Sequence, residues 1–178
     1  MRYAVLLRGV NVGGNRKVGM ADLRRVLESL GHTDVATYLQ SGNAVVTAAE
    51  SDPAKLERRI EKALSTQLGI DTRVLVRSHD ELAAAIEANP FPDAVKEPRL
   101  LHVAFLDRAP TPAARRRIAP DAYLPDEFRF GERAIYLRYA EGAGRSKLSQ
   151  APWDRLGVVA TARNWNTVVE LARRTEAS

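Results

Sequence analysis

Hydrophobic positions in the first 77 residues form either short apolar runs or helical stripes. Apolar runs bounded by turn residues predict strands, whereas apolar side chains recurring at i, i+3 and i+4 predict amphipathic helices. The runs occur at residues 3–8, 35–39, 44–47 and 72–77, and the helical stripes at residues 20–30 and 56–68. The resulting order is β-α-β-β-α-β, which is that of a ferredoxin-like α/β plait.

Residues that favour helix ends support this reading of the pattern. Asp52–Pro53 is typical of an N-cap followed by the first helical position, and Gly69 is typical of the residue that ends a helix. Ser78 and Glu81 have the spacing of a capping box. They predict a linker helix that ends at Asn89–Pro90, because the residue before a proline disfavours helical backbone.

The second half of the chain repeats the strand and helix order only in part. Strands are predicted at residues 99–107, 127–130 and 134–139, with a short helix that is capped by Thr111 and ends before Pro120. A further helix is predicted from Ser146, with an interruption near Pro152, and only residues 158–160 offer a short final strand. The last helix carries apolar residues on one predicted face: Trp165, Val168, Val169 and Ala172.

We therefore predict an α+β fold of two tandem ferredoxin-like α/β plait subdomains, the second imperfect. Residues 1–77 form the first subdomain, residues 78–98 a linker helix and connector, and residues 99–178 the second subdomain with its C-terminal helix. Units of this size have small cores, so burying a shared interface stabilises both.

The composition excludes several kinds of chemistry, but it says less about the binding partners. The 178 residues include no cysteine, which excludes disulfides, thiolate metal sites and cysteine nucleophiles. The net charge of +5 lies mostly in the second half, but its one run of cations, Arg115–Arg117, reads as a solvated helix face. The apolar start of the chain is interrupted by Arg8, too early for a signal peptide or a membrane span. We expect a cytoplasmic protein without a membrane partner.

Topology brings two glycine-bearing loops of the first subdomain to the same edge of its sheet, because right-handed crossovers fix the strand directions. Their backbone N–H groups would form an anion-binding nest at the start of a helix. The alternative is that both loops only turn the chain, with Gly and Asn at positive φ. The candidate residues of the two loops are Asn11, Gly13, Gly14, Asn15, Arg16 and Lys17 in the first and Tyr38, Gln40, Ser41, Gly42 and Asn43 in the second.

Two further polar segments lie in the second subdomain. The segment Gly142–Lys147 places Arg145, Ser146 and Lys147 after glycines at a predicted helix start, which suits a phosphate or a carboxylate. A serine N-cap with solvated cations explains it equally well. The segment Thr161–Thr167 offers Arg163 and Asn164 as donors, although Asn164 also fits an N-cap beside a buried tryptophan.

Catalytic and nucleic-acid signals are weak. The three histidines have no metal-ligand spacing, and no nucleophile motif occurs, so we predict no metal or cofactor and assign no catalytic residue. Aromatic residues lie on predicted strands of the second half, as in base-stacking RNA modules, but such rings more often form a core. They are Phe105, Phe128, Phe130, Tyr136 and Tyr139.

Five segments in register resemble the signature segments of domain-of-unknown-function family 1697, a bacterial family. They are Leu7–Gly14, Thr37–Asn43, Asn89–Phe91, Gly144–Leu148 and Thr161–Thr167. The resemblance implies tandem α/β plait subdomains, in agreement with the strand order above, and implies no activity. It adds weight to the polar loop residues as a site.

We therefore expect a small anionic or phosphate-bearing ligand in a cleft between the subdomains. Alternatives are a nucleic-acid-binding module that uses the arginine-rich second half, and an interaction protein whose polar motifs only hold the halves together. The sequence determines neither the reaction nor the oligomeric state. The candidate ligand-binding residues are Arg8, Asn11, Gly13, Gly14, Ser41, Asn43, Arg145, Ser146, Lys147, Arg163 and Asn164.

Overall fold

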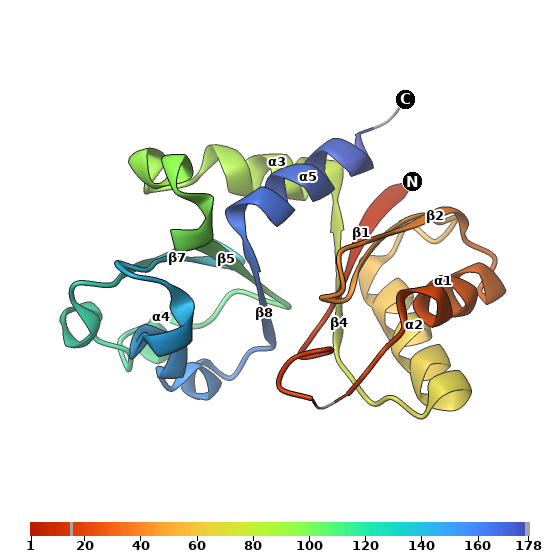
Figure 1. Cartoon of the computed structure of the whole chain (residues 1–178), viewed down its shortest axis with the longest axis horizontal. Coiled ribbons are helices and arrows are strands. Elements are labelled where there is room, and N and C mark those ends of the chain that lie inside the picture. The colour runs from red at the N-terminus through yellow and green to blue at the C-terminus, as the bar shows by residue number, and fades with distance from the viewer. Residues whose placement is uncertain (15, 177–178) are drawn as a thin grey trace. The chain divides into compact units, whose positions relative to one another are not determined.

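The computed structural model describes residues 1–14 and 16–176 (Figure 1). Asn15, which the sequence places in the first loop, lies outside the described residues. The chain divides into two compact units. The first consists of Met1–Ala83 with the segment that begins at Leu171, and the second of Ala84–Glu170. Each unit is described separately below.

The first unit is an α/β plait, as predicted. Its four-stranded antiparallel sheet has the order β2-β3-β1-β4, in which both crossover connections contain a helix. The elements are β1 (Arg2–Leu7), α1 (Met20–Ser29), β2 (Thr33–Tyr38), β3 (Asn43–Thr47), α2 (Pro53–Leu68) and β4 (Val74–Ser78), followed by α3 (His79–Glu87). The predicted capping box at the start of α3 is present, because Ser78 and Glu81 exchange backbone and side-chain hydrogen bonds.

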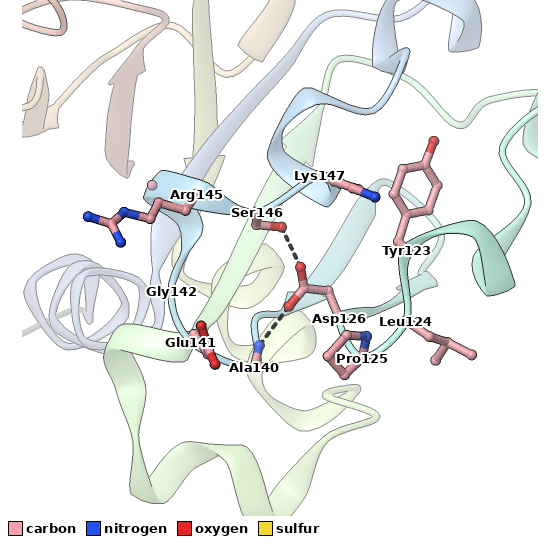
Figure 2. Close-up of a pocket in the computed structure, with 11 residues that line it drawn as sticks. Tyr123, Leu124, Pro125, Asp126, Ala140, Glu141, Gly142, Arg145, Ser146 and Lys147 are labelled. Carbon is pink, nitrogen blue, oxygen red and sulfur yellow. Dashed lines mark hydrogen bonds between the residues drawn. The ribbon is translucent and has the colours of Figure 1, made fainter.

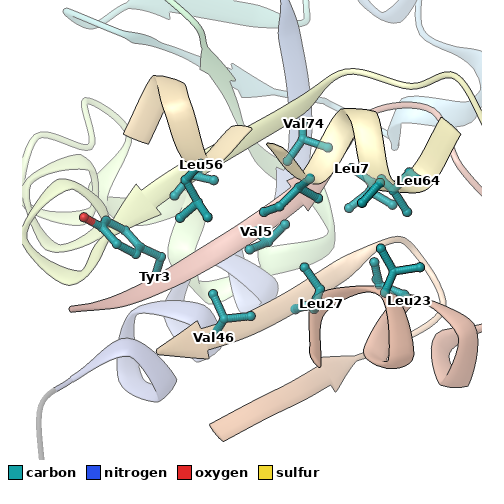
Figure 3. Packing of buried hydrophobic residues seen from close by; sticks show 14 of the residues in the cluster. Tyr3, Val5, Leu7, Leu23, Leu27, Val46, Leu56, Leu64 and Val74 are labelled. Atoms are coloured by element: carbon teal, nitrogen blue, oxygen red, sulfur yellow. The ribbon is translucent and has the colours of Figure 1, made fainter. Parts of the chain in front are cut away.

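The core of the first unit lies between one face of the sheet and helices α1 and α2 (Figure 3). Alternate residues of β1 point into this core because side chains alternate across a strand. The helices contribute leucines at helical spacing, such as Leu23 and Leu27 from α1. This packing fixes the strand ends, from which the polar loops project.

Asp52 caps α2 as the sequence predicts, and its removal tests this contribution to stability. The carboxylate accepts hydrogen bonds from the backbone N–H groups of Ala54, at 2.9 Å, and Lys55, at 3.3 Å. Loss of an N-cap acceptor costs a protein about 1 kcal/mol. Urea denaturation of Asp52→Ala is expected to show a loss of about that size. Asp52→Asn is the control, because asparagine caps equally well; an equal loss in both variants would contradict the capping role.

The second unit has the same strand order, β6-β7-β5-β8, in a four-stranded antiparallel sheet, which confirms the predicted tandem arrangement. It contains the short helix α4 (Pro112–Arg115) and the part of α5 (Trp165–Thr175) up to Glu170. Its strands are β5 (Leu101–Leu106), β6 (Glu127–Phe130), β7 (Ala134–Arg138) and β8 (Ala160–Asn164). Six 3₁₀ segments complete it: η1 (Pro92–Lys96), η2 (Pro98–Leu100), η3 (Pro120–Tyr123), η4 (Ala143–Arg145), η5 (Leu148–Gln150) and η6 (Trp153–Leu156).

The α-helix predicted from Ser146 is wrong. From Ser146 onward the chain instead forms the separate 3₁₀ turns η5 and η6, and the turn η4 directly precedes Ser146. Ser146 adopts extended backbone, and its hydroxyl accepts a hydrogen bond from the N–H of Leu148, which is a local turn and not a helix cap. Pro152 lacks the N–H that a continuous helix needs. The second plait is imperfect at this position, since three turns stand where the first plait has α2.

The end of the chain also differs from the prediction in two respects. Strand β8 extends to Asn164, so Arg163 lies on a strand and not at a helix start. The sequence obscures this strand because polar residues alternate with alanine and threonine instead of forming an apolar run. In α5, Val169 is 43% exposed and lies off the buried face that Val168 and Leu171 form.

Four of the five aromatic rings that the sequence places on strands of the second half are buried, namely Phe105, Phe128, Tyr136 and Tyr139. Phe128 makes edge contacts with Phe130 and with Trp153, at centroid distances of 5.6 and 5.3 Å. These rings form the core and do not offer a stacking surface. Among the described residues, no helix has both the length and the apolar character needed to cross a membrane.

Candidate functional site

A pocket of about 650 Å³ lies in the second unit, beside the loop that the sequence singles out after β7 (Figure 2). One wall is the segment that leads into β6, and the other is the loop that follows β7. The wall before β6 supplies Tyr123, Leu124, Pro125 and Asp126, and the loop supplies Ala140, Glu141, Gly142, Gly144, Arg145, Ser146 and Lys147. The pocket therefore contains the predicted residues Arg145, Ser146 and Lys147.

The buried carboxylate of Asp126 joins the two walls. It accepts hydrogen bonds from the backbone N–H of Ala140, at 2.7 Å, and from the hydroxyl of Ser146, at 2.5 Å (Figure 2). Hydrogen bonds to an ionised acceptor are stronger than neutral ones. The Ser146 hydroxyl in turn accepts from the N–H of Leu148, and the Ser149 hydroxyl donates to the carbonyl oxygen of Ala143. These hydrogen bonds therefore hold the loop in one conformation.

Arg145 and Lys147 flank this anchored serine, and both are exposed. In Figure 2 the Lys147 side chain extends on the side of Tyr123, while Arg145 extends on the other side of the serine. Within the part of the chain that the structure describes, neither cation forms a hydrogen bond or an ion pair through its side chain. Glu141 adds a carboxylate to the same lining. The pocket thus offers cations as donors and one solvent-facing acceptor.

Tyr139 directly follows β7, and its pKa reflects the electrostatics near this loop. Burial raises the pKa of its hydroxyl, the negative charge of Asp126 raises it further, and a hydrogen bond with Ser149 acts in the opposite direction. The phenol therefore stays protonated at neutral pH and is not a proton acceptor. Its role is to pack against the ring of His102, at 5.2 Å between centroids.

The two loops of the first unit meet, as the topology predicts, through the side chain of Asn11. Its amide nitrogen donates to the carbonyl oxygens of Val18 and Gln40, and its amide oxygen accepts from the N–H of Val18. Asn43 is fully buried and donates to the carbonyl oxygen of Tyr38 and to the hydroxyl of Ser41. These amides hold the turn together, which is what the turn-only interpretation expects.

Four further predicted residues of the first unit are exposed, namely Arg8, Gly13, Gly14 and Ser41. Gly13 and Gly14 have φ angles of +62° and +81°, and open space surrounds the position of a Cβ at each. Arg8 lines a separate pocket of the first unit. The structure does not bring these residues together at one site, so their role in ligand binding stays a prediction.

Arg163 and Asn164 lie at the end of β8, where their side chains make hydrogen bonds that stabilise the fold. The guanidinium of Arg163 is buried and donates to the hydroxyl of Thr161 and to the carbonyl oxygen of Ala162, each at 2.8 Å. Burial lowers its pKa to about 10, so it stays charged at neutral pH. The amide oxygen of Asn164 accepts from the N–H of Thr167 and caps α5.

Sequence reasoning missed the wall of the pocket that precedes β6. Asp126 is the residue on which the loop depends, yet it follows a proline in a connector and carries no motif. Its role comes from its contacts with Ala140 and Ser146, which are 14 and 20 residues away. No local pattern encodes a contact at that separation.

In the described ranges, the histidines and carboxylates do not come together as a metal site or as an acid–base pair of histidines. No group of three or more histidine, aspartate or glutamate side chains there is placed to hold a metal ion. Burial lowers the pKa of His32 and of His102, so both rings are neutral at pH 7. His79 contacts the carbonyl oxygen of Ala172 through Nδ1, at 2.9 Å. Each histidine is placed by the fold and not by a shared site.

The two sheets and the loops define an α+β protein of two tandem α/β plaits. The chain belongs to the family described as protein of unknown function (DUF1697), whose model matches residues 1–136. Among solved structures, the chain is similar to a conserved bacterial protein from Streptococcus pneumoniae, with 26% identity and a TM-score of 0.72. That similarity covers 98% of each of the two chains. No curated protein matches the chain.

Proposed function

We propose that the second unit binds a small molecule through an anionic group, a phosphate or a carboxylate, in the pocket beside the Ala140–Lys147 loop. The observation that carries this proposal is the pair of cations, Arg145 and Lys147, on either side of Ser146. Among described residues the two have no partner in the protein, while the hydroxyl between them is fixed by Asp126. The two cations on this loop are therefore preorganised to bind an anion.

The rest of the lining suits the organic part of such a ligand. Tyr123, Leu124 and Pro125 give an apolar wall, and Glu141 gives an acceptor for a hydroxyl or amino group. A mixture of apolar surface and a few polar groups is typical of small-molecule sites, as is a volume of several hundred Å³. The sequence-based expectation that first-unit residues take part in the same site stays a prediction, and this proposal depends on second-unit residues alone.

Charge removal at the loop tests the proposal. Inorganic phosphate, titrated into ¹⁵N-labelled protein, is expected to shift the backbone amides of Gly142, Gly144 and Ser146. Because a charge-assisted hydrogen bond contributes about 1.5 to 3 kcal/mol, Arg145→Gln and Lys147→Gln should each weaken binding by about tenfold or more. Arg116→Gln is the matched control, since Arg116 is an exposed arginine of the same unit outside the pocket.

Two results would contradict the proposal. One is an absence of amide shifts at the loop. The other is an equal shift with sodium chloride at the same ionic strength, because screening alone is not binding. Native mass spectrometry of freshly purified protein then looks for the organic part of the ligand, as a co-purifying mass that Lys147→Gln loses and Arg116→Gln retains.

Nucleic-acid binding by the second half stays a separate prediction with a different signature. Phosphate-backbone contacts release counterions, so the affinity falls steeply with salt. A gel shift that disappears in Arg116→Gln as readily as in Lys147→Gln would favour this alternative over the pocket.

A further inference from the structure

We propose a second anion site, specific for a phosphate group, in the first unit, where three arginines line one pocket. The pocket has a volume of about 340 Å³ and lies where the loop after β1 meets the segment before β4. Its lining consists of Arg8, Arg16, Glu61, Asp71, Thr72 and Arg73. This site involves the Leu7–Gly14 segment, which the pocket of the second unit does not use.

Two hydrogen bonds fix the backbone of Arg8 in position. Its N–H donates to the carbonyl oxygen of Arg73, at 2.9 Å, and its carbonyl oxygen accepts from the hydroxyl of Thr72, at 2.6 Å. The backbones of Arg8 and Arg73 are therefore held next to each other, although the two residues are 65 positions apart in the sequence. Thr72 is buried, so this junction belongs to the folded frame and not to a loose loop.

Arg16 approaches the same place from the loop. Its Nη1 lies 4.0 Å from the position that a Cβ would occupy on Gly9, the residue next to Arg8. The N–H of Asn11 donates to the carbonyl oxygen of Arg16, at 3.1 Å, which closes the loop on itself. The guanidinium of Arg16 therefore lies against the backbone beside Arg8.

The cations of this pocket are only partly neutralised. The Nε of Arg73 donates to the carboxylate of Glu61, at 2.9 Å, and the N–H of Val74 donates to the same oxygen. Glu61 is thus already satisfied by two donors. Arg8 and Arg16 form no side-chain hydrogen bond or ion pair with any residue in the described ranges. Asp71 is the remaining carboxylate of the lining.

A phosphate group fits this arrangement better than a carboxylate does. Planar guanidiniums donate in pairs to phosphate oxygens, and a phosphate has three terminal oxygens for donors that arrive from separate segments. Arg8 and Arg16 come from well-separated positions of the loop between β1 and α1, and Arg73 comes from the segment before β4. A phosphate between them also relieves the repulsion between like charges, which a bare pocket retains.

The experiment uses the full chain and follows the amides of Gly9, Gly13 and Gly14 during titration with inorganic phosphate. A parallel titration with glycerol 3-phosphate distinguishes free phosphate from a phosphoryl group on a larger molecule. Arg8→Gln and Arg16→Gln should each weaken binding about tenfold, as expected when a charge-assisted hydrogen bond is lost. Arg8→Lys keeps the charge and should recover only part of the affinity, because lysine cannot donate in the paired geometry.

Two controls separate electrostatics from folding. Asp71→Asn removes a negative charge from the lining and should tighten binding, a direction that damage to the fold does not produce. Arg58→Gln removes an exposed arginine of the same unit outside the pocket and should change nothing. The proposal is overturned if Arg8→Gln and Arg16→Gln bind phosphate as the unaltered protein does, or if sodium acetate shifts the same amides equally.

The two phosphate sites are distinguishable in one titration. Variants of Arg8 and Arg16 should leave the amide shifts of Gly142 and Gly144 intact, and variants of Arg145 and Lys147 should leave those of the first unit intact. Failure at one set of amides therefore says nothing against the other site.

Discussion

Gly42→Ala is expected to lower the stability of the first unit by about 3 kcal/mol, because the new methyl group combines backbone strain with overpacking. Gly42 has a φ angle of +77°, in the left-handed region that side chains disfavour. A Cβ there would lie 2.4 Å from Cγ2 of Val10 and 2.9 Å from Cβ of Leu7. Both neighbours are buried, so neither can move aside without disturbing the core.

The measurement is native-state hydrogen exchange at the amides of β1 and β3, which reports on the first unit. Gly69→Ala is the matched control, since Gly69 has a φ angle of +65° with nothing within 4 Å of a Cβ. It should cost only the backbone strain, about 1 kcal/mol. Equal losses in the two variants would show that the contacts with Val10 and Leu7 add nothing.

Asp126→Ala is expected to destabilise the second unit by about 3 kcal/mol, since hydrogen bonds to a charged group contribute about 1.5 to 3 kcal/mol each and two are lost. The substitution leaves the N–H of Ala140 and the hydroxyl of Ser146 without their acceptor. Asp126→Asn should lose less, because its amide oxygen still accepts one of these bonds. The loosened loop should also weaken phosphate binding by Arg145 and Lys147, even though a negative charge is gone.

Tryptophan fluorescence during urea denaturation measures this loss, because Trp153 and Trp165 both belong to the second unit. Asp121→Ala is the control; Asp121 is an exposed carboxylate of η3, close in sequence to Asp126, and makes no side-chain hydrogen bond within the described ranges. Surface substitutions of that kind change stability by at most about 0.5 kcal/mol. A similar loss in the Asp121 and Asp126 variants would remove the proposed link between the pocket walls.

The strands and helices with strong patterns could be predicted from the sequence. The apolar run of β1, the leucine stripes of α1 and α2 and the cap at Asp52 each carry local information, and the structure confirms them. The segment after β7 could not be predicted, because glycine, proline and serine allow several short turns of similar energy. Strand β8 differs for another reason. The sequence offers a short final strand only at residues 158–160, because the buried positions of β8 are Thr161 and Arg163, which no hydrophobic pattern identifies.

The candidate pocket was predictable only on one side. Glycines and cations at residues 142–147 mark a loop that can receive an anion. The other wall depends on Asp126, whose partners become neighbours only after β6 and β7 pair. The sequence also could not distinguish polar residues that hold a turn, such as Asn11 and Asn43, from residues with free donors, because both kinds use the same amino acids.

The first unit is built from two segments that are far apart in the sequence. The first unit contains Met1–Ala83 but also the end of α5, from Leu171, where Ala172 contacts His79 and the guanidinium of Arg174 lies 4.8 Å from the ring centroid of Tyr38. Because translation proceeds from the N-terminal to the C-terminal side, all of Ala84–Glu170 is made before Leu171 and the following residues of the first unit. The first unit therefore cannot complete its packing until the second unit has been synthesised.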